Sequence, residues 1–192
     1  MTHTLSPATA PVRPVRGRHG AVASPHHLAT QVGLTVLRSG GSAVDAAIAT
    51  NAALAVVAGH SCGLGGDAFW IIWDEARHEA VTLNGSGRAG SAATIDAAGA
   101  AGYRAMPERG PWSITVPGAV HSWGEAHRRL GRVDWASLLA PSIDLASGFP
   151  ASSGWLGAVE RSAAILGAER DWAFVYRPDD RARVPGQIVR LP

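Results

Sequence analysis

Residues 24–74 read SPHHLATQVGLTVLRSGGSAVDAAIATNAALAVVAGHSCGLGGDAFWIIWD, and this stretch decides the fold. It opens with an amphipathic pattern, which predicts a helix with Ser24 as its N-cap and Pro25 in its first turn. The pair Gly40 and Gly41 predicts the end of this helix. We therefore expect a short helix that buries one apolar stripe.

The second half of the stretch predicts a buried helix and then a hairpin. Ser42 and Asp45 have the spacing of a capping box, and the residues that follow are almost all small and apolar. A helix that is apolar on all sides is buried. The run AFWIIWD at 68–74, a polar turn and the run EAVTLN at 79–84 predict two antiparallel strands.

The remainder of the chain is predicted to be mainly helical. A glycine-rich loop over 85–94 leads to a short strand and a helix within 114–132. Further helices are predicted within 133–150, where Pro141 ends or kinks the helix, and within 152–167. The tail beyond them shows no capping or closing element.

The tryptophans of the hairpin bear on the fold class. Trp70 and Trp73 lie on opposite faces of the predicted first strand, so both faces of the sheet are expected to be covered. Together with the flanking helices, this pattern predicts an α/β (α+β) fold.

Composition excludes several classes of protein. The formal net charge is only +2, and the small arginine cluster near Arg128 fits a solvated helix end rather than a nucleic-acid surface. The single cysteine excludes an internal disulfide. Residues 1–20 read as a flexible lead-in without a signal-peptide core, and no apolar run is long enough to span a membrane. We therefore expect a cytoplasmic protein that binds neither nucleic acid nor membranes.

The stretch HSCGLGG allows three interpretations. Cys62 beside His60 could form a nucleophile and its base, which requires a setting that favours the thiolate. The glycines could hold a phosphate, although phosphate loops follow a strand and open a helix, the reverse of the order here. The third interpretation is a tight turn that leads into a buried strand, with Cys62 as a small buried residue.

Two other groups of residues are candidate ligands. The eight histidines suggest a metal, but His26 and His27 are adjacent and should point to different faces, and no metal-binding spacing is present. We therefore expect no metal and no other cofactor. Arg88 lies in a glycine-rich loop just after a strand, and a guanidinium can hold a carboxylate with two hydrogen bonds. The alternative is an exposed loop arginine without function.

The order of these segments resembles the gamma-glutamyltransferase family. The resemblance rests on the helix, Gly-Gly, helix, Gly-x-Gly-Gly, strand series of residues 20–74 and on residues 116–152, which begin VPGAVHSWGEAHRRLGRVDW. It covers the chain from about residue 17 to the end. Residues 21–192 would then be the N-terminal part of a large subunit, ending within a domain.

This resemblance implies an N-terminal-nucleophile hydrolase with a four-layer αββα sandwich, made as a proenzyme that cleaves itself. A threonine at the start of the small subunit would be the nucleophile, with its own amino group as the base. Backbone amides of the small subunit would bind the oxyanion. Cys62 would then be a turn residue. The expected partners are a small-molecule amide substrate and the C-terminal part or small subunit of the same enzyme.

Two departures from the family pattern affect the prediction. Glutamyl-transferring members carry an arginine shortly after the second hairpin strand, but here Ser86 holds that position and Arg88 lies two residues later. The form NGSGRAG is more similar to the branch that contains oxamate amidohydrolase. The resemblance therefore supports amide hydrolysis more strongly than it supports specificity for gamma-glutamyl substrates. We expect Arg88 to bind a substrate carboxylate.

The second departure is that no Thr-Thr-His-like junction is present, because Thr94 and Thr115 have the wrong context. We therefore expect no catalytic residue in this chain, which would be inactive alone as a fragment or split part of the enzyme. The alternative function is a non-catalytic interaction or assembly module derived from the same fold.

Overall fold

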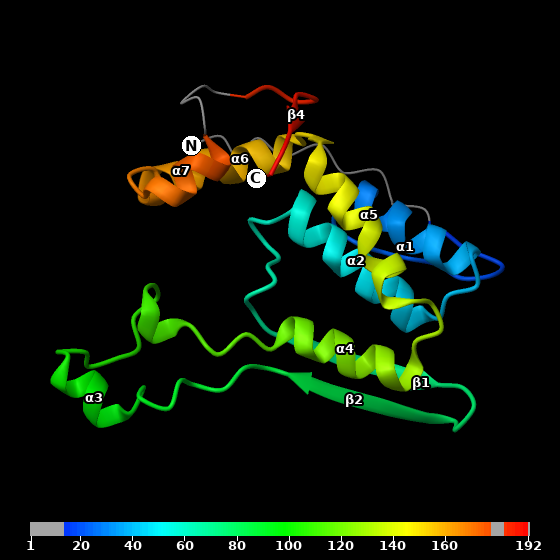
Figure 1. Ribbon diagram of the computed structural model, residues 1–192, viewed down its shortest axis with the longest axis horizontal. Helices are drawn as coiled ribbons and strands as arrows, with labels where there is room; N and C mark the ends of the chain where they lie inside the picture. Colours follow the sequence, from blue (N-terminus) through cyan, green and yellow to red (C-terminus); the bar gives the residue numbers. More distant parts are fainter. Residues whose placement is uncertain (1–13, 178–182, 192) are drawn as a thin grey trace, which may run out of the picture.

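The computed structural model describes residues 14–177 and 183–191 and shows a mixed α/β fold (Figure 1). No helix in these residues is long and apolar enough to cross a membrane. The elements in chain order are α1 (His27–Arg38), α2 (Ala43–Val57), β1 (Ala68–Asp74), β2 (Glu79–Gly85), α3 (Ile95–Ala100), the 3-10 helix η1 (Pro111–Ser113), α4 (Ala119–Leu130), α5 (Trp135–Ser147), β3 (Phe149–Pro150), α6 (Ser153–Leu166), α7 (Arg170–Tyr176) and β4 (Ile188–Val189).

Helix α1 begins later than the sequence predicted. Its N-cap is His26, whose Nδ1 accepts a hydrogen bond from the Leu28 amide at 3.3 Å. The prediction of Ser24 as N-cap was wrong, because the Ser24 hydroxyl donates instead to the His26 carbonyl. The end of the helix was predicted well: Ser39 is the C-cap, and Gly40 adopts a φ of +91°, a conformation that favours glycine.

Helix α2 is the buried helix that the sequence predicted. Its capping box is present, with Ser42 Oγ accepting from the Asp45 amide and the Asp45 carboxylate accepting from the Ser42 amide. Most of its residues are buried, because α2 packs against α1 and α5 and also contacts α4 (Figure 1). The fold is therefore built around this helix.

The hairpin has the predicted strands, but only one of its faces is covered. Strands β1 and β2 pair antiparallel, with Ile71 opposite Thr82. Trp70 and Ile72 pack toward the helices, whereas Phe69, Ile71 and Trp73 are 71%, 86% and 60% exposed. The prediction that both faces are covered was wrong for the described residues, because the helix that packs along the hairpin, α4, lies on one side of it (Figure 1).

Two further predictions in the second half of the chain need correction. Helix α5 is continuous through Pro141, so the proline does not end it, and the alternative that it kinks the helix stays a prediction. Helix α5 packs against α2 and buries Leu138 fully, and this packing offsets the loss of the backbone hydrogen bond that a proline removes from a helix. No strand forms at residues 114–116; there, the Val116 amide donates to the Arg88 carbonyl at 2.9 Å.

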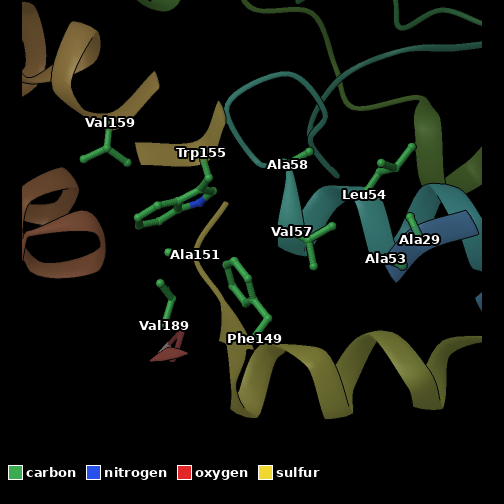
Figure 2. Close-up of a cluster of buried hydrophobic side chains, with 10 residues drawn as sticks. All are labelled: Ala29, Ala53, Leu54, Val57, Ala58, Phe149, Ala151, Trp155, Val159 and Val189. Carbon is green, nitrogen blue, oxygen red and sulfur yellow. The ribbon is translucent and has the colours of Figure 1, made fainter. Parts of the chain in front are cut away.

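The C-terminal tail closes a second part of the core, which corrects the prediction of a tail without a closing element. Strand β4 pairs with β3, placing Val189 opposite Phe149, and both side chains are fully buried. Figure 2 shows them beside Trp155 in one apolar cluster that extends to Val57 of α2. A two-residue strand of this kind has no periodic signal in the sequence.

Residues 86–116 form an excursion that the sequence analysis described only as a loop. It contains α3 and η1, and Figure 1 shows α3 well away from the other helices. Thr94 is the N-cap of α3. Of the predicted lead-in at 1–20, residues 1–13 lie outside the described residues, and the boundary at residue 20 stays a prediction.

Candidate functional site

Arg88 is exposed on the loop that follows β2. Among the described residues, no acidic side chain forms an ion pair with it. A guanidinium in this state keeps its full capacity for a carboxylate ligand, because its charge is not neutralised by the protein. The structure thus places the predicted ligand residue at an accessible position.

The backbone of the Arg88 loop is held by two other segments. The Gly87 amide donates to Asp67 Oδ1 at 2.7 Å, and the Val116 amide donates to the Arg88 carbonyl at 2.9 Å. The hydroxyl of Thr115 also donates to Asp67 Oδ1, at 3.4 Å. The glycine-rich turn before β1, the loop after β2 and the segment before α4 therefore meet at Asp67.

Glycines allow these three segments to approach closely. A Cβ on Gly87 would overlap the Val116 carbonyl, and a Cβ on Gly118 would overlap the Gly85 carbonyl. The Gly118 amide donates to the Gly66 carbonyl at 3.1 Å, so the glycine-rich turn also anchors the start of α4. The function of these glycines is backbone packing around the Arg88 loop.

A cavity of about 520 Å³ lies next to this junction. It is bounded by the extended segment 21–25, by one face of α2 and by the start of β1, and Asp67 belongs to its lining. Trp123 also lines it, and the indole nitrogen of this buried residue has no hydrogen-bond partner in the described structure. Arg88 does not line the cavity.

The geometry gives no support to a Cys62–His60 nucleophile. Cys62 is partly buried and packs against the apolar cluster of Figure 2. No hydrogen bond joins the two side chains in the described part of the chain. Burial lowers the pKa of His60, and the charge of Arg161 lowers it further. Cys62 therefore has the surroundings of a packing residue in the segment that follows α2.

The histidines also have structural environments. The prediction that His26 and His27 point to different faces was wrong. Their rings stack with centroids 4.8 Å apart, because His26 precedes the helix. His127 Nε2 donates to the Val133 carbonyl at 2.7 Å. Within residues 14–177 and 183–191, no group of three potential ligand side chains is placed to hold a metal.

Sequence reasoning missed Asp67 and Thr115 as partners of the Arg88 loop. Asp67 directly follows the glycine run, and an acidic residue at that point is the one signal that could have indicated a role. No local sequence pattern indicates a role for Thr115, because its contact with Asp67 joins segments 48 residues apart.

Comparisons with known proteins identify the relatives of this chain. The profile of the gamma-glutamyltranspeptidase family matches residues 29–192. The chain is 41% identical over 175 residues to the glutathione hydrolase-like YwrD proenzyme of Bacillus subtilis (strain 168), covering 90% of this chain and 33% of that protein. It is 39% identical over 181 residues to the oxamate amidohydrolase proenzyme of Klebsiella pneumoniae, covering 91% of this chain and 34% of that protein.

A solved structure gives the same result for the fold. The crystal structure of Helicobacter pylori gamma-glutamyltranspeptidase superposes with a TM-score of 0.85 at 26% identity, covering 93% of this chain and 52% of that chain. The chain spans about a third of the length of the curated relatives it matches.

Proposed function

The chain belongs to the gamma-glutamyltranspeptidase family, and on this premise we propose that it forms the N-terminal part of the large subunit of an amide hydrolase or acyltransferase. The complete enzyme is made as a proenzyme, and its threonine nucleophile is supplied by sequence outside these 192 residues. The chain contributes a framework and one substrate-binding residue, Arg88. Alone, it is inactive.

The chemistry follows from what each part supplies. The threonine hydroxyl attacks the amide carbonyl as its proton passes to the threonine amino group; the same proton then passes to the amide nitrogen, which leaves as an amine, and an acyl-enzyme forms. Water or a second amine then takes the acyl group. Arg88 holds a carboxylate of the substrate and so orients the amide bond toward the nucleophile. The substrate is a small amide with a carboxylate, either a gamma-glutamyl compound of glutathione metabolism or an oxamate-like amide.

The observation that carries this proposal is the state of Arg88. Its guanidinium is exposed and has no acidic partner in the part of the chain that the structure describes, while hydrogen bonds from Gly87 and Val116 hold the backbone of its loop. A charged side chain on a fixed backbone is suited to repeated binding of one anion.

The exposed face of the hairpin supports a partner that completes the fold. Phe69, Ile71 and Trp73 expose an apolar surface that a second layer of the αββα sandwich would cover. Within the described residues β1 pairs only with β2, so a further strand could join the sheet at its free edge. The C-terminal part or small subunit of the same enzyme is the proposed partner. A cytoplasmic location stays a prediction.

One experiment tests the role of Arg88. In the product of the complete reading frame that contains this chain, Arg88→Ala should raise KM for a carboxylate-bearing amide about 10- to 100-fold, because a charge-assisted hydrogen-bonded pair contributes about 1.5–3 kcal/mol. The value of kcat should change little. Arg104→Ala, at another exposed arginine of the same excursion, is the matched control. An unchanged KM in Arg88→Ala would refute the assignment.

A second function has one observation in its favour. Strand β4 buries Val189 against Phe149, so the tail completes an apolar cluster inside this chain. A non-catalytic interaction module should close its core in this way. A sharp, reversible unfolding transition of the isolated chain would support the non-catalytic module. Soluble aggregates that bind a hydrophobic dye would instead support the proposal that the chain is one part of a larger enzyme.

A further inference from the structure

We propose that Asp67 is the positioning residue for Arg88: it fixes the backbone of the loop after β2, and so fixes the point from which the Arg88 side chain reaches its ligand. The proposal rests on the proposed function only for the ligand that Arg88 binds. The positioning itself is a property of this chain.

Asp67 is placed where it can control the loop. It immediately precedes β1, whose first residue, Ala68, pairs with Gly85 at the end of β2. Its carboxylate therefore reaches just past the last strand pair, and the 2.7 Å hydrogen bond from the Gly87 amide is short. Hydrogen bonds to an ionised acceptor are shorter and roughly twice as strong as neutral ones.

The hydrogen bonds on each side of Arg88 fix the direction of its Cα–Cβ bond. The peptide group between Ser86 and Gly87 is held through the Gly87 amide, and the peptide group after Arg88 is held through the Arg88 carbonyl, which accepts from Val116. Peptide groups are planar, so only the dihedral angles of Gly87 and Arg88 lie between these two anchors. Without Asp67, Gly87 could take many conformations, because glycine restricts its backbone least.

Asp67 performs this role without neutralising the arginine. No ion pair within 4.0 Å joins the two side chains in the described structure, so the guanidinium keeps its charge for a ligand. The Thr115 hydroxyl donates to the same Oδ1 and ties the carboxylate to the segment before α4. Asp67 thus connects the Arg88 loop, through Gly87, with the segment before α4, through Thr115.

The first test is nuclear magnetic resonance of the 192-residue chain with Ile71→Thr as a common background, because this change reduces the self-association that the exposed hairpin face favours. In Asp67→Ala, hydrogen exchange of the Gly87 amide should become at least about tenfold faster, and the downfield shift of its proton should be lost. Asp67→Asn keeps an oxygen acceptor and should restore most of the protection. Asp134→Ala removes a carboxylate that accepts a backbone amide at the start of α5, and should leave Gly87 unchanged.

The second test uses oxamate as a carboxylate probe of the Arg88 side-chain signals. In the wild-type chain, oxamate should shift the Arg88 Nε–Hε signal, and Asp67→Ala should weaken this binding at least about threefold. Equal binding by both chains would overturn the positioning role. If oxamate does not shift the Arg88 signal of the wild-type chain, the proposed role of Arg88 in binding a carboxylate fails. The positioning role of Asp67 is then decided by the hydrogen exchange of the Gly87 amide and by the order of the Arg88 side chain in Asp67→Ala. Unchanged exchange and order would overturn it.

Discussion

At the scale of single residues, Asp45 shows how one buried carboxylate connects distant parts of the chain. It is fully buried, and its Oδ2 accepts from the Ser42 amide at 2.8 Å and from the Arg132 amide at 2.9 Å. Its Oδ1 lies 3.9 Å from His127 Nε2. The carboxylate thus caps α2 and holds the chain that leaves α4.

Replacing Asp45 should be costly. Asp45→Ala leaves two backbone amides without their acceptor in a buried place, so the free energy of unfolding should fall by about 3 kcal/mol. Asp134→Ala removes an exposed N-cap of α5 and should cost about 1 kcal/mol. Denaturant unfolding of both variants measures the difference. Equal losses would show that the contact with Arg132 contributes nothing.

At the scale of elements, helix α1 depends on the protonation state of its N-cap. The Nδ1 atom of His26 can accept from Leu28 only while it carries no proton. Burial lowers the pKa of His26, and the neighbouring rings of His27 and His60 lower it further. Acid therefore removes the cap and adds positive charge beside two other imidazoles.

The pH dependence of stability follows from this shift. The pKa of His26 in the folded chain lies below its ordinary value of 6.5, so the unfolded chain binds the proton first. The stabilisation by His26 is complete above about pH 6.5 and is lost as the pH falls through the folded pKa.

We expect His26→Asn to reduce the loss of stability between pH 7.5 and pH 5, because asparagine caps a helix at every pH in this range. Denaturant unfolding at several pH values measures it. His121→Asn, at an exposed histidine of α4, is the control and should keep the wild-type profile. If the slopes of wild type and His26→Asn coincide, the cap is not the source of the pH dependence.

The elements differ in how well the sequence predicts them. The capping box at Ser42 and the hairpin could be predicted because their signals are local: cap spacing and a run of β-forming residues. The N-cap of α1 was misplaced because histidine is not a favoured cap, and only its Nδ1 geometry makes it one. Strand β4 and the Asp67 contacts could not be predicted, since they join segments far apart in the chain.

At the scale of the whole molecule, the hairpin divides the surface into a covered and an open side. Helix α4 covers one face of β1 and β2 (Figure 1), and the side chains of Phe69, Ile71 and Trp73 are exposed. The outer edge of β1 is also unpaired in the described structure. An open apolar sheet face with a free edge favours association with another chain.

The isolated chain should therefore self-associate, and Ile71→Thr should reduce this. The residue is 86% exposed, so the free energy of unfolding should change by no more than about 0.5 kcal/mol. Ile72→Thr, on the covered face, should instead destabilise the fold. Sedimentation velocity and denaturant unfolding separate the two effects. A monomeric wild-type chain would show that this face needs no cover.

We propose that this chain is one part of an amide hydrolase whose threonine nucleophile lies outside it. The most direct measurement is the sequence of the transcript through and beyond the codon for Pro192. We expect a continuation, in frame or in a neighbouring frame, that encodes a Thr-Thr-His-like junction. A stop codon at this point, with no such junction in any neighbouring frame, would contradict the claim and favour the non-catalytic module.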